Sequence, residues 1–87
     1  MNVENLNKLT DRVANDLHVQ LRAKGSRLLD CREIFDDPVI PGRCNFYTWA
    51  QLKDGKWVGA SADYPGALTL QEYDYILNRL ESMKSCG

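Results

Sequence analysis

The dipeptide Asp54-Gly55, between two aromatic-rich runs, is the feature that most constrains how this chain can fold. The runs cover residues 46–52 and 57–62. Asp-Gly between two such runs is a strong signal for a β-hairpin with a two-residue type I′ turn, because both central positions of that turn need a positive φ. We therefore predict an antiparallel hairpin with its tip at these two residues.

The position of the turn sets the pairing of the strands, and the pairing sets which side chains share a face. A two-residue turn pairs Leu52 with Trp57, Ala50 with Gly59, and Thr48 with Ser61. One face then carries the two alanines that permit close approach and the aromatic residues that supply area, and we expect helices to cover it: Tyr47, Trp49, Val58, Ala60 and Ala62. The opposite face is predicted to be mostly solvated, with an apolar patch.

Residues 3–24 are predicted to form an amphipathic helix. Apolar residues recur at intervals of three or four and fall on one stripe: Val3, Leu6, Leu9, Val13, Leu17 and Leu21. Residues 17–24 also alternate between apolar and polar, which is typical of a strand. Their residue types favour the helix, so the strand stands as the alternative.

A second helix is predicted to begin after Thr69, because Thr69 and Glu72 match the capping box. Its buried stripe is predicted to contain Leu70, Tyr73, Ile76, Leu77, Leu80 and Met83, and residues 84–87 are predicted to be a flexible tail. Residues 28–35 could add a short strand, and the prolines at 38 and 41 predict a loop over residues 36–44.

These elements predict one small α+β domain over residues 1–87, with both helices on one face of a small antiparallel sheet. The order is helix, an optional strand, two hairpin strands and a helix. A chain of 87 residues has room for one domain and not for two.

Charge and cysteine content bound the function classes. Eleven basic against twelve acidic side chains leave a net charge of −1, which excludes a strongly basic nucleic-acid binder as a description of the whole chain. The odd number of cysteines, Cys31, Cys44 and Cys86, favours reduced thiols, with a Cys31–Cys44 bridge as the minor alternative. With no secretory signal at residues 1–5, we expect a cytoplasmic protein.

The sequence shows no constellation that predicts catalysis or metal binding. The single histidine, His18, has no cysteine pair at zinc-ligand spacing to join. The acidic residues Glu33, Asp36 and Asp37 match no calcium loop, and the last two are explained by a turn before Pro38. We therefore expect a non-enzymatic protein with no metal and no cofactor.

Nucleic-acid binding is an alternative function. Arg22, Lys24, Arg27 and Arg32 form a local basic segment, and the hairpin aromatics could stack on bases. The element order also resembles that of double-stranded-RNA-binding domains, which run helix, three strands, helix. Those domains present basic residues at the start of the last helix, where this chain has Glu72 and Asp74.

The segment Asp54-Gly55-Lys56-Trp57-Val58-Gly59-Ala60-Ser61-Ala62-Asp63-Tyr64-Pro65-Gly66 carries a second resemblance. It is similar to the hairpin and Asp-Leu-Pro-Gly corner of HicB-type antitoxins, whose following helix also opens with a Thr-x-x-Glu box. The resemblance spans residues 52–80 and implies a domain that neutralises a small RNA-cleaving toxin by direct binding. The segment before Thr69 is shorter than that family's next strand.

The leading hypothesis is a small protein-binding module that occupies a partner surface as an inhibitor, an antitoxin-like protein or an accessory regulator. The predicted partner-binding residues are Phe46, Leu52 and Trp57, with Tyr64 at the rim of the patch. A homodimer formed through the same patch is equally compatible. The alternative is that Leu52 and Trp57 only close the end of the hairpin.

Overall fold

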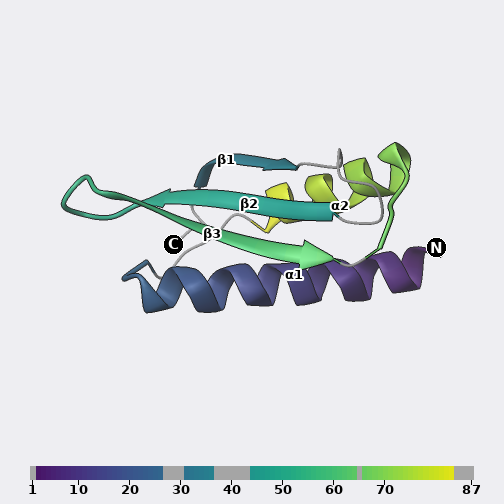
Figure 1. Cartoon of the computed structure of the whole chain (residues 1–87), viewed down its shortest axis with the longest axis horizontal. Coiled ribbons are helices and arrows are strands. Elements are labelled where there is room, and N and C mark those ends of the chain that lie inside the picture. The colour runs from purple at the N-terminus through teal and green to yellow at the C-terminus, as the bar shows by residue number, and fades with distance from the viewer. Residues whose placement is uncertain (1, 27–30, 37–43, 65, 84–87) are drawn as a thin grey trace.

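The computed structural model describes residues 2–26, 31–36, 44–64 and 66–83. Its elements are α1 (Val3–Ala23), β1 (Cys31–Asp36), β2 (Cys44–Gln51), β3 (Trp57–Tyr64) and α2 (Leu70–Ser82). Within the described residues the strands form one antiparallel sheet in the order β1-β2-β3, with α1 running along the β3 side (Figure 1). The α+β prediction is confirmed, and β1 confirms the optional strand.

Helix α1 has the predicted apolar stripe, and its continuation to Ala23 rules out the strand alternative for residues 17–23. The helix begins at the N-cap Asn2, whose side-chain oxygen accepts a hydrogen bond from the Asn5 N–H at 2.8 Å. Leucine and valine side chains from the stripe are buried from Leu6 to Leu21, whereas Val3 is 58% exposed at the first turn. After the helix Gly25 has a φ of +97°, a conformation that suits glycine at a helix end.

The hairpin turn lies where the sequence predicts, but it contains three residues rather than two. Leu52 and Lys56 close the loop through the Leu52 N–H, which donates to the Lys56 carbonyl at 2.8 Å. Within the loop Gly55 alone has a positive φ, of +88°, and its N–H donates to the Leu52 carbonyl at 2.9 Å. This is a type I turn followed by a left-handed glycine, so the predicted type I′ turn is wrong.

The extra loop residue shifts the pairing of β2 and β3 by one position. Trp49 pairs with Gly59, Thr48 with Ala60, and Phe46 with Ala62. Because side chains alternate across a strand, the shift reverses both faces of β2 relative to the prediction. The placement of Tyr47 and Trp49 under the helices is therefore wrong, whereas Ala60 and Ala62 of β3 do face the core as predicted.

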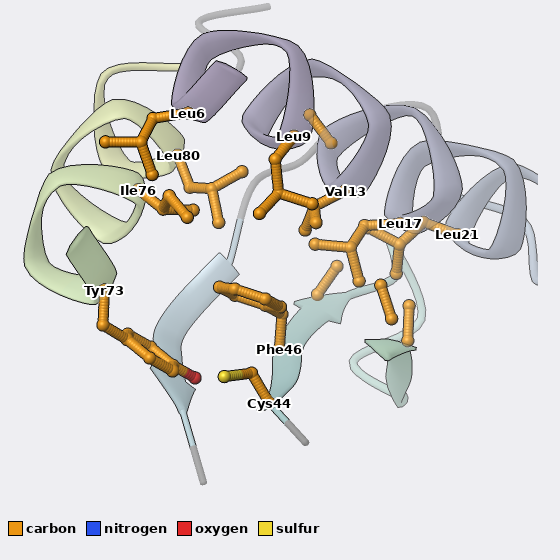
Figure 2. Close-up of a cluster of buried hydrophobic side chains, with 14 residues drawn as sticks. Leu6, Leu9, Val13, Leu17, Leu21, Cys44, Phe46, Tyr73, Ile76 and Leu80 are labelled. Atoms are coloured by element: carbon orange, nitrogen blue, oxygen red, sulfur yellow. The ribbon is translucent and has the colours of Figure 1, made fainter. Parts of the chain in front are cut away.

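Phe46 is the central side chain of the core (Figure 2). Its ring stacks on Tyr73 of α2, with the centroids 5.1 Å apart and the planes inclined by 23°. The Tyr73 hydroxyl donates to the Asn45 carbonyl at 2.6 Å, so the phenol is buried with its polar end satisfied. Ala62, directly opposite Phe46 on β3, leaves room for the leucines of α1.

Helix α2 begins with the predicted capping box. The Glu72 N–H donates to Thr69 Oγ1 at 3.1 Å, and the Thr69 N–H donates to the Glu72 carboxylate at 3.0 Å. The hydrogen bond from the Thr69 backbone lowers the pKa of Glu72 because it stabilises the charged carboxylate. Leu70, predicted to be in the buried stripe, is 74% exposed.

A polar cluster joins the two helices beside the core. Asn7 Oδ1 of α1 accepts hydrogen bonds from the Tyr75 hydroxyl at 2.7 Å and from Arg79 Nη1 at 2.5 Å. Arg79 also lies 3.8 Å from an Asp11 carboxylate oxygen. These contacts set how α2 lies against the N-terminal half of α1.

The remaining sequence predictions concern segments near β1 and the end of the chain. β1 pairs with β2 with an irregularity between Cys31 and Ile34. The predicted loop falls mainly on residues 37–43 and the predicted tail on residues 84–87, and both segments lie outside the described residues. Cys44 is a buried free thiol, which contradicts a Cys31–Cys44 bridge.

Thr48 supplies a test of the core. Its side chain is fully buried, and its hydroxyl has no hydrogen-bond partner in the parts of the chain that the structure describes. Valine has nearly the same shape without the hydroxyl, so Thr48→Val is expected to raise the free energy of unfolding by about 1 kcal/mol, measured by urea denaturation.

Thr10→Val is the matched control for this substitution. Thr10 is equally buried, but its hydroxyl donates to the Leu6 carbonyl at 2.7 Å. This control is expected to give no gain in stability, because a hydrogen bond is lost. A Thr48→Val variant that is less stable than the parent would contradict the placement of Thr48 in the core.

Candidate functional site

The sheet face opposite the helices carries two exposed indoles. Trp49 is 42% exposed and Trp57 is 43% exposed, and the half-buried Tyr47 lies beside them on β2. The strand pairing places these side chains on one side of the sheet together with Gly59 and Ser61 of β3. We call these five residues the aromatic face.

Trp49 lies directly over Gly59, its partner on β3. A β-carbon at position 59 would lie 3.0 Å from Cζ3 and 3.1 Å from Cε3 of the indole, which is closer than ordinary contact distances. The absence of a side chain at Gly59 therefore lets the ring lie against the backbone of β3. One side of the indole covers the strand, and the remaining surface is open to solvent.

Side chains at the C-terminal end of α1 form hydrogen bonds with backbone groups on the outer edge of β3. Gln20 Nε2 donates to the Ser61 carbonyl at 2.5 Å, and the Ser61 N–H donates to Gln20 Oε1 at 3.0 Å. Lys24 Nζ donates to the Gly59 carbonyl. The amide of Gln20 thus takes the place that a neighbouring strand would occupy, and it protects an edge that could otherwise pair with another chain.

A shallow, open groove of about 380 Å³ lies between the end of α1 and the aromatic face. Its lining residues are Gln20, Lys24, Tyr47, Thr48, Trp49, Gly59, Ala60 and Ser61. We call it the α1–β3 groove. The described lining residues include a lysine ammonium and no carboxylate.

Of the four predicted partner-binding residues, only Trp57 lies on the aromatic face. Phe46 is fully buried in the core, so its placement on an exposed patch is wrong. Leu52 is half-buried on the helix side, where its methyl groups approach Gly25. Tyr64 is also half-buried and packs against the core, so the structure does not bring the four side chains together on one surface.

The alternative nucleic-acid site is described only in part. Arg22 and Lys24 are exposed near the end of α1. Arg27 lies outside the described residues, and Arg32 lies in β1, where side chains are not described. Of the four predicted side chains, the structure therefore places only Arg22 and Lys24.

Sequence reasoning missed Tyr47 and Trp49 as members of the surface, whereas it placed Gly59, Ser61 and Trp57 on the open face, where the structure has them. A usable signal was present at Gly59, because a glycine inside a strand often marks a close approach of another group. A second signal was the segment Leu52-Lys53-Asp54-Gly55, since glycine after a type I turn is typical of a three-residue hairpin loop. That loop would have placed Trp49 on the open face.

The described residues contain no group of three or more His, Cys, Asp or Glu side chains that could hold a metal ion. Among the described helices, none is both long enough and apolar enough to cross a membrane.

Comparison with family models, with curated proteins and with solved structures gives no match to this chain.

Gly59→Ala tests the packing of the indole on β3. The added β-carbon is expected to push Trp49 away from the strand, because the ring atoms lie too close to the new methyl group. In a Trp57→Phe background, so that Trp49 is the only tryptophan, the emission should shift to the red and acrylamide quenching should increase.

Ser61→Ala in the same background is the control, because Ser61 lies on the same strand and face and bonds Gln20 through its backbone only. Its emission should match that of the parent. Emission that is equally unchanged in Gly59→Ala would contradict the contact between Trp49 and Gly59.

Proposed function

We propose that this chain is a non-enzymatic protein-binding module that acts by occupying a partner surface through the aromatic face. The observation that carries the proposal is the pair of exposed indoles, Trp49 and Trp57, on one side of the sheet. Tryptophan is among the residues that most often dominate binding energy at protein interfaces, and exposed aromatic clusters often mark such interfaces.

The arrangement of the sheet supports this choice. The helices pack their apolar stripes against one face, so the core uses Phe46 and Tyr73 while Trp49 and Trp57 remain outside it. Gly59 holds one of these indoles flat, and a side chain ordered before binding loses less conformational entropy when a partner docks. This ordering of Trp49 supports its role as an aromatic anchor in the proposed docking surface.

The proposed mode of action is steric: the bound module covers a surface that its partner needs. An inhibitor, an antitoxin-like protein and an accessory regulator all act in this way. The partner is a protein, and a second copy of this chain is the other occupant that the test below distinguishes. Under this proposal the chain needs no metal or cofactor.

Alanine substitution of the indoles tests the proposal. Trp49→Ala and Trp57→Ala are each expected to weaken partner capture from the host extract, or homodimer formation measured by light scattering, by about tenfold or more. Thermal unfolding should change little, because both side chains are more than two-fifths exposed in the fold.

Leu70→Ala is the matched control, because Leu70 is a large exposed apolar residue that lies outside the aromatic face. Its binding should equal that of the parent. Unimpaired binding in both tryptophan variants would contradict the proposal, and so would unfolding of those variants. Binding that instead falls steeply with added salt in the parent would favour phosphate contacts and the nucleic-acid alternative.

A further inference from the structure

The α1–β3 groove combines an apolar wall with hydrogen-bond donors at its rim. The wall is the indole of Trp49 lying over Gly59. The rim is formed by Gln20 of α1 and by Lys24, the C-cap residue of that helix, and both side chains reach the backbone of β3. A groove with these two parts suits a ligand that has an apolar group next to a hydrogen-bond acceptor.

Lys24 and Gln20 each have N–H donors left over after their hydrogen bonds to β3. An ammonium group has three N–H donors, and the bond from Lys24 to the Gly59 carbonyl takes one of them. The Gln20 amide has two, and the bond to the Ser61 carbonyl takes one. The remaining donors belong to exposed or half-buried side chains within the groove lining, where they are available to an acceptor.

The charge of the groove lining indicates which kind of hydrogen-bond acceptor a ligand should carry. Among the described lining residues, Lys24 is the cation and none carries a carboxylate. An anionic acceptor would gain charge-assisted hydrogen bonds, which are roughly twice as strong as neutral ones, without meeting a like charge on those residues. Asp63 lies on the same strand but beyond Ser61, outside the lining.

We propose that the α1–β3 groove binds an acidic, extended peptide segment of the partner protein. An Asp or Glu carboxylate of the segment accepts hydrogen bonds from Lys24 and Gln20, and a neighbouring apolar side chain packs on the Trp49 indole. This inference rests on the proposed protein-binding function, and it names the chemistry of the partner.

Two features separate this mode from other ways of binding at the same place. The segment is not an added β-strand, because Gln20 already bonds both backbone groups of Ser61 and Lys24 already bonds the carbonyl of Gly59. A single-stranded nucleic acid would need several cations along its backbone, whereas the described residues of the groove lining supply one. A peptide carboxylate needs only that one.

Charge reversal at Lys24 tests the inference. A randomised heptapeptide library is selected on the folded parent chain, and the enriched peptides are measured by fluorescence anisotropy. We expect enrichment of Asp or Glu next to apolar residues. Lys24→Glu should weaken binding of the leading acidic peptide by about tenfold or more, because it replaces a cation with a like charge.

Lys53→Glu is the matched control, since Lys53 is an exposed lysine at the hairpin tip and lies outside the groove lining. It changes the net charge equally and should alter the affinity less than about twofold, as expected for a distant, screened charge. Thermal unfolding of both variants shows that they are folded before binding is compared.

The contrary outcomes are distinct. Enrichment with no acidic preference, or an equal loss in Lys24→Glu and Lys53→Glu, would overturn the acidic-segment inference. If Trp49→Ala nevertheless abolished binding of the enriched peptides, those peptides would still depend on the aromatic face, and the proposed function would stand. The inference would also be overturned if no peptide were enriched, or if labelled oligothymidine bound more tightly than the best peptide. In either case the tryptophan variants in the partner-capture test would decide on the proposed function separately.

Discussion

The stacking of Phe46 on Tyr73 determines which face of the sheet the two helices cover. The rings lie 5.1 Å apart, and both side chains are buried. Because neighbouring residues of a strand point to opposite faces, placing Phe46 inside also places Thr48 and Ala50 inside and turns Tyr47 and Trp49 outward. The burial of Phe46 therefore determines which residues β2 contributes to the aromatic face, and the pairing with β3 adds Trp57, Gly59 and Ser61.

Helix α1 links the core to the candidate binding surface. Its leucines fill the space above the alanines of β3, while Gln20 and Lys24 reach around the edge of the same strand to the Ser61 and Gly59 backbone. The helix thus stabilises the sheet on one side and forms a wall of the α1–β3 groove on the other. The exposed ends of these side chains offer binding chemistry that can be altered without removing the apolar stripe of the helix.

Much of the fold can be predicted from local sequence signals, but which side chains of β2 point toward the core cannot. The spacing of the leucines predicts α1, and the Thr69-x-x-Glu72 capping box predicts the start of α2; both helices are observed there. Asp54-Gly55 fits both a two-residue and a three-residue hairpin loop, and the strand registers of these two loops differ by one residue. Because β2 has aromatic residues on both faces, its hydrophobic pattern does not indicate which register is correct. That ambiguity is why Trp57 was predicted to be exposed while Trp49 was missed. The bonds between Gln20 and Ser61 join residues 41 apart, a separation that no local pattern spans.

The register of β2 against β3 is tested most directly by nuclear Overhauser contacts between α-protons across the hairpin. Since Leu52 and Lys56 form a hydrogen-bonded pair, the alternating pattern makes Tyr47–Ser61, Trp49–Gly59 and Gln51–Trp57 the closely spaced pairs. Strong α-proton contacts within these three pairs are the predicted result. Strong contacts instead between Thr48 and Ser61 and between Ala50 and Gly59 would shift the ladder by one residue, turn Trp49 toward the helices and contradict the account.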